Sequence, residues 1–454
     1  MNNNFKKIAL LIGDIGVLYL SLYLTLLIRY WGQPIQGDWQ SHFWPFTIIF
    51  VAWILIFYIS NLYDLNVAVN NVKFFQRTGR SLIIAGLLSA AFFYLTPQIN
   101  IAPKRNLLIY IIVFAALFYL WRQFYNWSLK AYLPKNIIAI IGLNDQVKEL
   151  ARELKQKPHL GYKIAFIVDD KNSGSDEINS IPVIKSILDL ERMIKEKNVT
   201  TIILTSDPHQ SSELRSCLFK CLPLKINYIS LPNFYEAITG KIPIVAINQM
   251  WFLENLSEGN KMPFDIAKRG YDIVLALMIL AITLPFWIII GLLIKLDSKG
   301  PILFSQNRVG KNNKLFKIIK FRTMATVNND FSPTQANDKR ITKFGSFLRE
   351  TRIDEIPQMI NILKGEMSFA GPRPERPELI KNLEEAIPFY KERMLVKPGI
   401  TGWDQISGEY HSPSSEDTLK KLQYDLFYIK NRSIYLDLSI VLKTIATVLG
   451  RAGR

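Results

Sequence analysis

The chain has 454 residues, of which 49% are hydrophobic and 20% charged, and its formal net charge is +17. This length exceeds one ordinary hydrophobic core and indicates two or three domains. High apolar content combined with a basic excess is typical of a membrane protein that carries substantial soluble parts. The basic residues flank hydrophobic runs and form no nucleic-acid-binding module. The composition therefore argues against nucleic acid and favours anionic lipid or phosphorylated ligands.

Cysteine and histidine usage narrows the chemistry further. The two cysteines, Cys217 and Cys221, lie four residues apart in a segment that is predicted to be helical and cytosolic. We therefore interpret them as reduced thiols and not as a disulfide. The four histidines are scattered along the chain. Their spacing argues against a histidine-based metal site and against a Ser-His triad.

Four apolar runs predict a four-helix transmembrane domain over residues 1–130. They are approximately Ile8–Ile28, Phe43–Ile59, Leu82–Leu95 and Leu107–Leu120. The first two have the length needed to cross a bilayer, and the last two need their flanking residues. Because no small-residue cleavage site follows the first run, we interpret it as an anchor and not as a signal peptide.

Basic residues at the ends of these runs orient the domain. The segments before the first run, between the second and third, and after the fourth together carry eight of them, whereas the other two loops together carry three. The positive-inside rule then places both ends of the domain, and everything after residue 130, in the cytoplasm. The residues on the cytoplasmic side are Lys6, Lys7, Lys73, Arg77, Arg80, Arg122, Lys130 and Lys135, and those on the opposite side are Arg29, Lys104 and Arg105.

Residues 136–250 alternate β-branched apolar runs with helical patterns, which predicts a small parallel α/β domain of the Rossmann-like type. The expected strands are 136–141, 163–168, 200–205 and 226–230. The turn after the first strand contains Gly142 alone, whereas a dinucleotide fingerprint needs several glycines where the backbone touches pyrophosphate. We therefore favour a degenerate domain with a structural or regulatory role over a cofactor-binding one. Residues 251–267 are read as a linker.

The run Tyr271–Ile294 is almost wholly apolar, yet it does not read as a simple fifth crossing. Pro285 interrupts the helical hydrogen bonds in its middle. Basic residues precede and follow the run, so both of its ends favour the cytoplasmic face. A re-entrant hairpin that breaks at Pro285 and dips into one leaflet satisfies both observations. Thr283 is a candidate hydrogen-bond donor for the backbone groups freed at that depth. The flanking basic residues are Lys268, Arg269, Lys295 and Lys299.

Residues 264–454 combine this run with a basic segment rich in Gly and Pro, and they predict a third, mostly helical domain. Helical patterns cover 341–352, 354–363, 376–395 and 415–430. The tail 433–450 is amphipathic, which fits either a core helix or a helix lying on the membrane surface.

The candidate site of this domain is an acidic pair, Asp354 and Glu355, set close to Arg349 and Arg352 and followed by Pro357. Arginine suits phosphate because its planar fork donates two parallel hydrogen bonds. A carboxylate can hold Mg²⁺ or attack phosphorus. Two further basic motifs flank the pair, one containing Lys320 and Arg322 and the other containing Arg373. The pattern predicts phosphate chemistry at a membrane surface.

Six motifs in order resemble those of the polyprenyl-phosphate glycosyl-1-phosphate transferases. These are monotopic bacterial sugar transferases that start O-antigen, capsule or exopolysaccharide synthesis. The four-helix front, the degenerate middle domain and the proline-broken apolar run resemble the long members of that family. The motifs are Gly300–Gly310, Lys320–Met324, Arg352–Gln358, Ser368–Glu375, Lys397–Gln405 and Tyr424–Asn431.

The resemblance implies an enzyme of the bacterial inner membrane whose catalytic domain lies on the cytoplasmic face. It would transfer a sugar phosphate from a UDP-sugar to undecaprenyl phosphate and release UMP. Asp354 matches the family's nucleophile, and Glu355 matches the residue that coordinates Mg²⁺. The residues that would bind the substrates are Lys320, Arg322, Arg352, Arg373, Gln405 and Asp425, although Arg352, like Arg349, could instead contact lipid headgroups.

Two departures from the family pattern leave the sugar open. Asp404 stands where a small residue is usual, and the stretch 408–415 lacks the common Asn-Gly-Arg pattern. Two alternatives also stay open. One is a hydrolase or kinase that uses the same acidic pair, although no Walker A loop is present. The other is a non-catalytic membrane scaffold or regulator of polysaccharide export. The exposed membrane helices would also allow a homodimer.

Overall fold

A computed structural model describes most of the chain and divides it into two compact units, Met1–Leu231 and Pro232–Arg454. The described residues are 3–31, 36–63, 72–96, 103–132, 136–156, 160–169, 177–178, 180–205, 211–256, 261–325, 338, 340–407 and 414–449.

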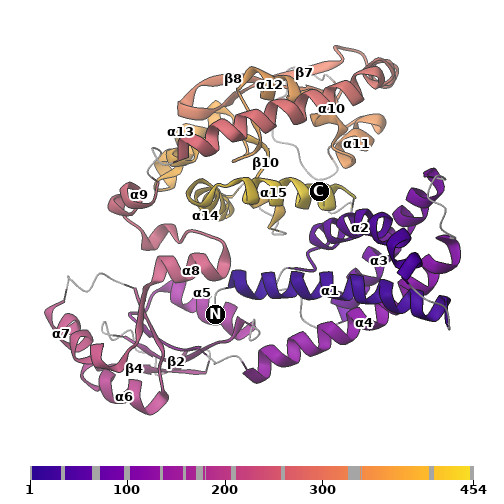
Figure 1. Ribbon diagram of the computed structural model, residues 1–454. Helices are drawn as coiled ribbons and strands as arrows, with labels where there is room; N and C mark the ends of the chain where they lie inside the picture. The colour runs from indigo at the N-terminus through magenta and orange to yellow at the C-terminus, as the bar shows by residue number, and fades with distance from the viewer. Residues whose placement is uncertain are drawn as a thin grey trace. The chain divides into compact units, whose positions relative to one another are not determined.

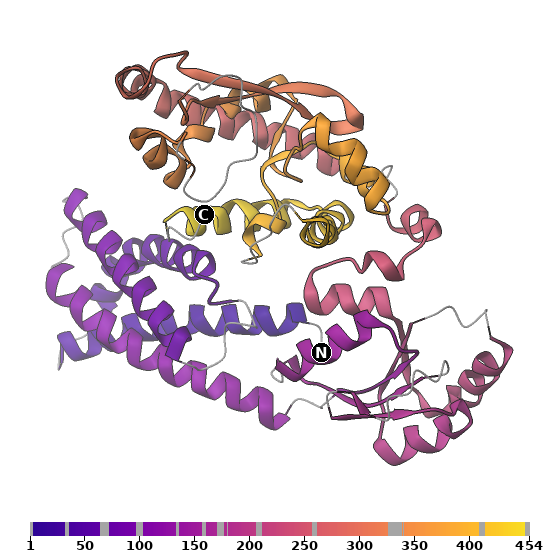
Figure 2. The ribbon, with the colours of Figure 1, turned by 180° about the vertical axis from the view of Figure 1, so that it is seen from behind.

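Four long helices begin the first unit and confirm the four apolar runs predicted from the sequence (Figure 1). They are α1 (Asn3–Arg29), α2 (Gln36–Ile59), α3 (Val72–Leu95) and α4 (Pro103–Tyr132). Each is long and apolar enough to cross a bilayer. They pack beside one another, as the view from behind also shows (Figure 2). Their shared core is rich in buried aromatic rings, which include Phe46, Trp53, Phe57, Tyr110 and Phe114.

The position of Arg122 shows that it is not one of the charges flanking the helix bundle. The sequence places it after the fourth apolar run as a cytoplasmic flanking charge, but α4 continues for ten residues beyond it. Its guanidinium is buried and forms an ion pair with Asp14 of α1 at 2.7 Å. It also donates to the carbonyl of Leu62 at 3.2 Å. Lys135 lies outside the described residues. The helices are identified as possible spans by length and composition alone, so the orientation of the bundle stays a prediction.

The second part of this unit is the predicted α/β domain. Its six-stranded sheet has the order β3-β4-β2-β1-β5-β6, and all neighbours are parallel except β3 and β4. The parallel sheet confirms the expected class, while the β3–β4 hairpin at its edge was not predicted. The strands are β1 (Asn136–Ile141), β2 (Tyr162–Val168), β3 (Glu177–Ile178), β4 (Ile181–Ile184), β5 (Thr201–Leu204) and β6 (Asn227–Ser230), and the helices are α5 (Asp145–Gln156), α6 (Leu190–Lys197) and α7 (Ser212–Cys221).

Gly142 ends β1 for a reason of packing. Its φ angle is +94°, and a β-carbon at this position would collide with the hydroxyl of Thr205. Only glycine combines this backbone conformation with so close an approach. The single glycine of the turn is therefore explained by the fold itself, without a bound nucleotide.

The boundary between the units differs from the one expected at residue 250. The segment after β6 contains α8 (Leu231–Thr239) and α9 (Gln249–Asn255). Beyond residue 231 it belongs to the second unit, where Ile242, Trp251 and Leu256 are buried in the hydrophobic core. Residues 251–256 are consequently part of that core and not of a linker. The sequence missed this because a short apolar segment does not reveal which domain buries it.

The second unit is built around α10 and confirms the helical patterns at the C-terminal end of the chain. It also contains two small sheets that were not predicted, an antiparallel β7–β8 hairpin and a parallel β9–β10 pair. Its elements are α10 (Met262–Asp297), β7 (Leu303–Val309), β8 (Leu315–Phe321), α11 (Lys343–Glu350), η8 (Ile353–Glu355), α12 (Gln358–Lys364), β9 (Ser368–Ala370), α13 (Pro377–Ala386), η9 (Tyr390–Leu395), β10 (Gly399–Thr401), α14 (Ser415–Asn431) and α15 (Ile434–Leu449).

Helix α10 runs through Pro285 as one helix of 36 residues, and the expected hairpin turn stays a prediction. The hydroxyl of Thr283 donates to the carbonyl of Ile279 at 2.7 Å. It therefore does not serve the carbonyl of Ala281, which is the group that Pro285 leaves without its helical donor.

Both ends of α10 are attached to the same unit. Near its beginning, Arg269 donates to the carbonyl of Ile362 in α12. At its end, Arg322 donates to the carbonyl of Ser298 at 2.6 Å. The two attachments tie both ends of α10 to this unit, and the path of the helix relative to a membrane stays a prediction.

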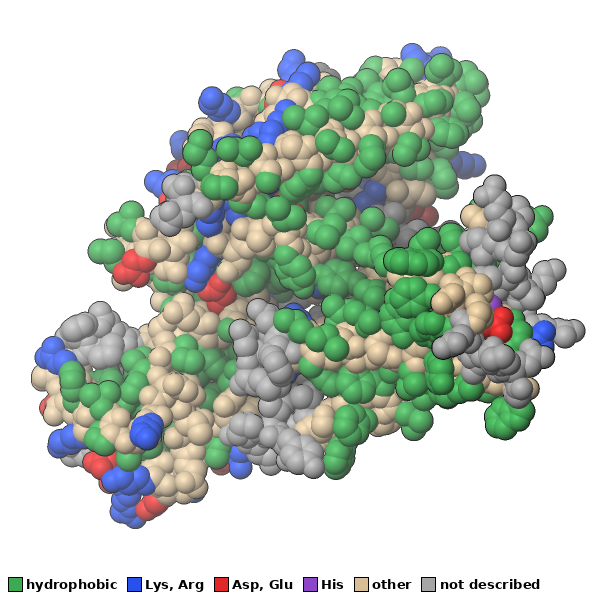
Figure 3. Space-filling model, viewed as in Figure 1, with side chains coloured by type: hydrophobic (Ala, Val, Ile, Leu, Met, Phe, Trp, Pro, Cys, Tyr) green, Lys and Arg blue, Asp and Glu red, His purple; other side chains and the backbone are tan. Residues whose placement is uncertain are grey.

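The outward face of α10 is apolar and exposed (Figure 3). Only 6% of the most apolar stretch of α10 is buried within the structure. A face of this size on a soluble surface would be an aggregation hazard, and it fits contact with lipid. The exposed residues include Ile266, Val274, Leu277, Met278, Ile282, Phe286, Ile288, Ile289 and Leu292.

Candidate active site

The backbone between α11 and α12 places the acidic pair. Arg352 adopts a left-handed conformation with φ of 54°, which ends α11 and turns the chain into the short helix η8. Asp354 and Glu355 occupy η8, and Pro357 precedes the first turn of α12. Pro357 thus lies where its fixed φ suits the start of a helix. The pair is thereby presented toward the end of β8.

Lys320, the penultimate residue of β8, meets both carboxylates. Its ammonium donates to Oε1 of Glu355 at 2.7 Å and lies 4.0 Å from Oδ2 of Asp354. The side chains of Asp354 and Glu355 are only 11% and 12% exposed. The structure therefore brings together three of the predicted site residues in a largely dry environment.

The two carboxyl groups differ in proton affinity. Burial raises the pKa of Asp354 to about 6, against the opposing effect of the Lys320 ammonium. Burial also acts to raise the pKa of Glu355, but the positive charges of Lys320 and Arg373 outweigh it and bring that pKa down to about 2. At neutral pH both groups are consequently ionised, and Asp354 is the more basic of the two.

Arginines surround the pair, as the sequence predicts. The positive charge of Arg373 lowers the pKa of both carboxyls, and that of Arg349 lowers the pKa of Asp354. Arg352 lowers the pKa of Glu355. Arg349 also donates from Nε to the hydroxyl of Thr323 at 2.9 Å, which holds it beside the pair. An incoming phosphate would find several guanidinium groups already in place.

A divalent cation fits this donor set. Oε2 of Glu355 is buried and has no hydrogen-bond partner within the described part of the chain. The described residues contain no group of three or more His, Cys, Asp or Glu side chains placed to hold a metal ion by themselves. Mg²⁺ commonly binds one or two carboxylates and takes its other ligands from water and substrate phosphate. Asp354 and Glu355 match that pattern.

The remaining predicted residues lie elsewhere in the unit. Arg322 is buried and donates to the carbonyls of Ser298 and Ile294 at the end of α10. Gln405 accepts a hydrogen bond from the N–H of Gly402 at 2.8 Å and so closes the turn after β10. Arg322 and Gln405 therefore form hydrogen bonds within the unit itself, and the expectation that they contact a substrate stays a prediction. Pro285 lies inside α10. The stretch 408–413 is outside the described residues.

Asp425 is buried in α14 and forms an ion pair with Arg393 of η9 at 2.8 Å. Sequence reasoning missed Arg393, which connects Asp425 to the site. Arg393 also donates to the carbonyl of Arg373 at 3.0 Å and to the hydroxyl of Tyr390 at 2.5 Å. Arg393 therefore fixes the loop that carries Arg373 beside the acidic pair. No local signal marks it, because it lies in an ordinary helical pattern and its partners are distant in sequence.

Replacing Arg393 by methionine is expected to lower the stability of the second unit by about 3–5 kcal/mol, because the Asp425 carboxylate would be left buried without its partner. The measurement is the thermal unfolding of the detergent-purified chain. Lys391→Met, which changes an exposed neighbour, is the matched control and should unfold like the wild type. Equal unfolding temperatures for Arg393→Met and the control would contradict the importance of the pair.

Comparison with known proteins identifies the class. Residues 264–451 match the family described as bacterial sugar transferase, and residues 58–232 match a CoA-binding domain. The chain is 33% identical over 320 residues to a UDP-glucose:undecaprenyl-phosphate glucose-1-phosphate transferase of Escherichia coli, which covers 68% of this chain and 67% of that protein. The chain therefore belongs to the bacterial sugar transferase family, which confirms the resemblance of its motifs.

Two further relatives show how the similarity is distributed. A UDP-N-acetylgalactosamine-undecaprenyl-phosphate N-acetylgalactosaminephosphotransferase of Aeromonas hydrophila is 38% identical over 248 residues, which is 54% of this chain and 57% of that protein. An exopolysaccharide production protein of Rhizobium leguminosarum is 40% identical over 194 residues, which is 41% of this chain and 96% of that protein. The chain thus spans somewhat more than half the length of the Aeromonas relative.

Proposed function

We propose that this protein transfers a sugar 1-phosphate from a UDP-sugar to undecaprenyl phosphate and releases UMP, as the first membrane step in building a polysaccharide. The observation that carries the proposal is the buried Asp354–Glu355 pair, with Lys320 at hydrogen-bond distance and arginines around it. The names of the relatives support the reaction class, since they couple sugar phosphates to undecaprenyl phosphate. Their sugars differ, so the donor sugar is left open.

In the first half-reaction, an oxygen of the Asp354 carboxylate attacks the β-phosphorus of the UDP-sugar. A bond forms between that oxygen and phosphorus, and the bond from phosphorus to the bridging oxygen of UMP breaks. The electron pair of the broken bond leaves with UMP. Asp354 suits this attack because it is the more basic carboxylate of the pair and is still ionised at neutral pH.

In the second half-reaction, a phosphate oxygen of undecaprenyl phosphate attacks the same phosphorus and displaces the Asp354 carboxylate. One phosphoanhydride is broken and another formed over the two steps, so the overall change is nearly balanced. Because the donor leaves before the acceptor reacts, the site need not hold a nucleotide and a long lipid together. This suits a site at the edge of a membrane.

The chain's own residues offset the repulsion between a carboxylate and an anionic phosphate. Arg373 and Arg349 place positive charge beside Asp354, and Lys320 fixes the rotamer of Glu355. Bound Mg²⁺ would supply further positive charge to the phosphate oxygens and the departing UMP. Glu355, with its unpartnered oxygen, is the residue that would hold it.

To test this function, purified protein is incubated with each member of a panel of UDP-hexoses and UDP-N-acetylhexosamines. We expect one of them to release UMP without lipid acceptor, in an amount stoichiometric with the enzyme. Mass spectrometry should then find the mass of a phosphosugar on the peptide that contains Asp354. If UMP appears only after undecaprenyl phosphate is added and no adduct forms, the two-step mechanism is wrong.

The same proposal places α10 within the cytoplasmic leaflet, with both ends on the cytoplasmic side. In a background where Cys217 and Cys221 are serine, Lys299→Cys should resist a membrane-impermeant maleimide in intact cells and react after permeabilisation. Gly37→Cys, at the start of α2 on the predicted outer side, is the control and should react in intact cells. Labelling of Lys299→Cys from outside would show that α10 crosses the membrane.

A further inference from the structure

A second group of cations lines a cavity near the beginning of α10. The cavity has a volume of about 100 Å³. It shares no residue with the cluster around Asp354 and Glu355. Its five basic side chains outnumber its two carboxylates. The basic residues are Lys268, Arg269, Lys311, Lys397 and Arg432, and the acidic residues are Asp265 and Asp272.

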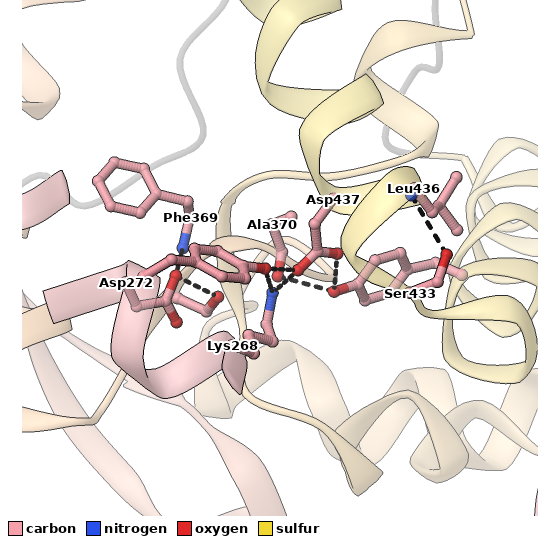
Figure 4. A network of polar contacts seen from close by, with 10 residues as sticks. Lys268, Asp272, Phe369, Ala370, Ser433, Leu436 and Asp437 are labelled. Atoms are coloured by element: carbon pink, nitrogen blue, oxygen red, sulfur yellow. Dashed lines mark hydrogen bonds and ion pairs between the residues drawn. The ribbon is translucent and has the colours of Figure 1, made fainter. Parts of the chain in front are cut away.

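The two carboxylates are already engaged. Oδ1 of Asp272 accepts hydrogen bonds from the hydroxyl of Ser368 at 3.1 Å and from the N–H of Phe369 at 3.2 Å (Figure 4). Asp265 lies 3.5 Å from the guanidinium of Arg432. A third acid, Asp437, pairs with Lys268 from outside the lining, and three acids against five bases still leave the cavity a positive excess.

Two of the cations are held in position by the fold. Lys268 forms an ion pair with Asp437 of α15, within the network that joins α10 to β9 and α15 (Figure 4). Arg269 donates to the carbonyls of Ile362 at 2.5 Å and Leu363 at 2.7 Å. Both side chains therefore lose little freedom when an anion binds, which is the condition for a preorganised site.

Lys311 and Lys397 carry the uncompensated charge. Neither has a carboxylate within ion-pair distance across the described ranges of the chain. A β-carbon at Gly365 would lie 3.6 Å from both Nζ of Lys397 and Nη2 of Arg269, so these two cations converge on one point. Burial, and then repulsion from Arg269 and Lys311, lower the pKa of Lys397 despite the attraction of the Asp272 and Asp265 carboxylates. An anion in the cavity would relieve this repulsion.

The cavity lies where the lipid-facing surface of α10 begins. Met262 and Ile266, which lie within the two turns before Lys268 and Arg269, are 67% and 65% exposed. Hydrophobic side chains continue along the helix (Figure 3). A cationic cavity beside an apolar face is the arrangement that receives an anionic headgroup while its chains stay in the lipid.

We propose that this cavity binds a phosphate group, and that it is a site separate from the acidic pair. Lysine and arginine together provide the charge and the forked donors that phosphate needs. The phosphate would come either from the headgroup of an anionic phospholipid or from a free phosphate ion. The proposal rests on the cavity alone and does not depend on the catalytic role of Asp354.

The test measures binding to the full chain purified in detergent. One arm titrates phosphatidylglycerol and counts bound lipid by native mass spectrometry, and the other titrates inorganic phosphate by calorimetry. The variant Lys311→Gln with Lys397→Gln removes the uncompensated charges. The control Lys381→Gln with Lys391→Gln removes two exposed charges of the same unit. A third variant, Lys311→Arg with Lys397→Arg, keeps both charges.

We expect the glutamine pair at Lys311 and Lys397 to bind at least tenfold more weakly than the wild type, while the control and the arginine pair bind normally. Weakening in the lipid arm alone identifies a headgroup site, and weakening in the phosphate arm identifies a site for the free ion. Equal binding by the glutamine pair and the control in both arms would overturn the proposal. So would loss of binding in the arginine pair. Asp354→Asn should bind normally in either arm, which separates this test from that of the reaction.

Discussion

Replacement of Asp354 by asparagine is expected to lower the rate of UMP release on the order of 10⁴-fold or more. An amide has no anionic oxygen to attack phosphorus, and removal of a covalent nucleophile costs rates of this size in other enzymes. Asparagine keeps the shape and volume of the side chain, so the buried position next to Lys320 should still pack. The measurement combines steady-state UMP release with mass spectrometry of enzyme incubated with donor alone.

The matched control is Glu350→Gln, which makes the same change of carboxylate to amide four residues earlier on the exposed end of α11. It should retain turnover and the adduct. The decisive result is that Asp354→Asn loses turnover and the adduct together. Wild-type turnover in Asp354→Asn would show that Asp354 is not the nucleophile. Loss of turnover with retention of the adduct would place the covalent bond on another residue.

The sequence predicted those parts of the fold that depend on local pattern. The apolar runs found all four helices of the bundle because length and hydropathy alone define a membrane span. Alternating strands and helices identified the parallel sheet, and the expected strands differ from the observed ones by at most one residue at either end. Even so, the short β3–β4 hairpin escaped notice, because strands of two and four residues leave almost no periodicity to detect.

Contacts between distant residues were beyond such reasoning. Arg122 looked like a flanking charge because the apolar run ends before it, but its partner Asp14 is 108 residues away. The resemblance placed Arg322 and Asp425 in motifs of the active site, whereas the structure shows them bonded to the end of α10 and to Arg393. The motifs therefore indicated which residues belong near the site, but not which of them face a substrate.

The β7–β8 hairpin shows a second limit. Most residues of β7 are exposed or half-buried, so the strand lacks the alternation that a one-sided sheet produces. Its partner β8 does alternate, with Phe316 and Ile318 turned inward. This hairpin matters because it delivers Lys320 to the acidic pair. The proximity of Lys320 to Asp354 and Glu355 was thus implied by family resemblance alone, and its geometry needed the structure.

Replacement of Lys320 by methionine is expected to lower kcat/KM for the donor by about 10²-fold at neutral pH, a typical cost for losing one preorganised charged donor. Methionine fills a similar volume without the charge. The ammonium at present lowers the pKa of both carboxyls, against their burial. Its removal leaves two buried acids close together, which favours protonation of Asp354 and so removes the nucleophile.

The pH profile distinguishes this electrostatic role from a loss of packing. Asp354 must be ionised to attack, and burial raises its pKa to about 6. In the wild type, kcat/KM should therefore be constant above that value and fall as the pH is lowered through it. Lys320 opposes the rise in pKa, so Lys320→Met should move this acid limb to higher pH.

Lys320→Arg, which restores a positive charge, should return the limb toward its wild-type position even if geometry keeps the rate low. Lys317→Met, on the same strand with an exposed side chain, is the control and should leave both rate and profile unchanged. If Lys320→Met lowers kcat/KM equally at every pH, the ammonium does not set the ionisation of Asp354, and its contribution must come from positioning Glu355 through their 2.7 Å hydrogen bond.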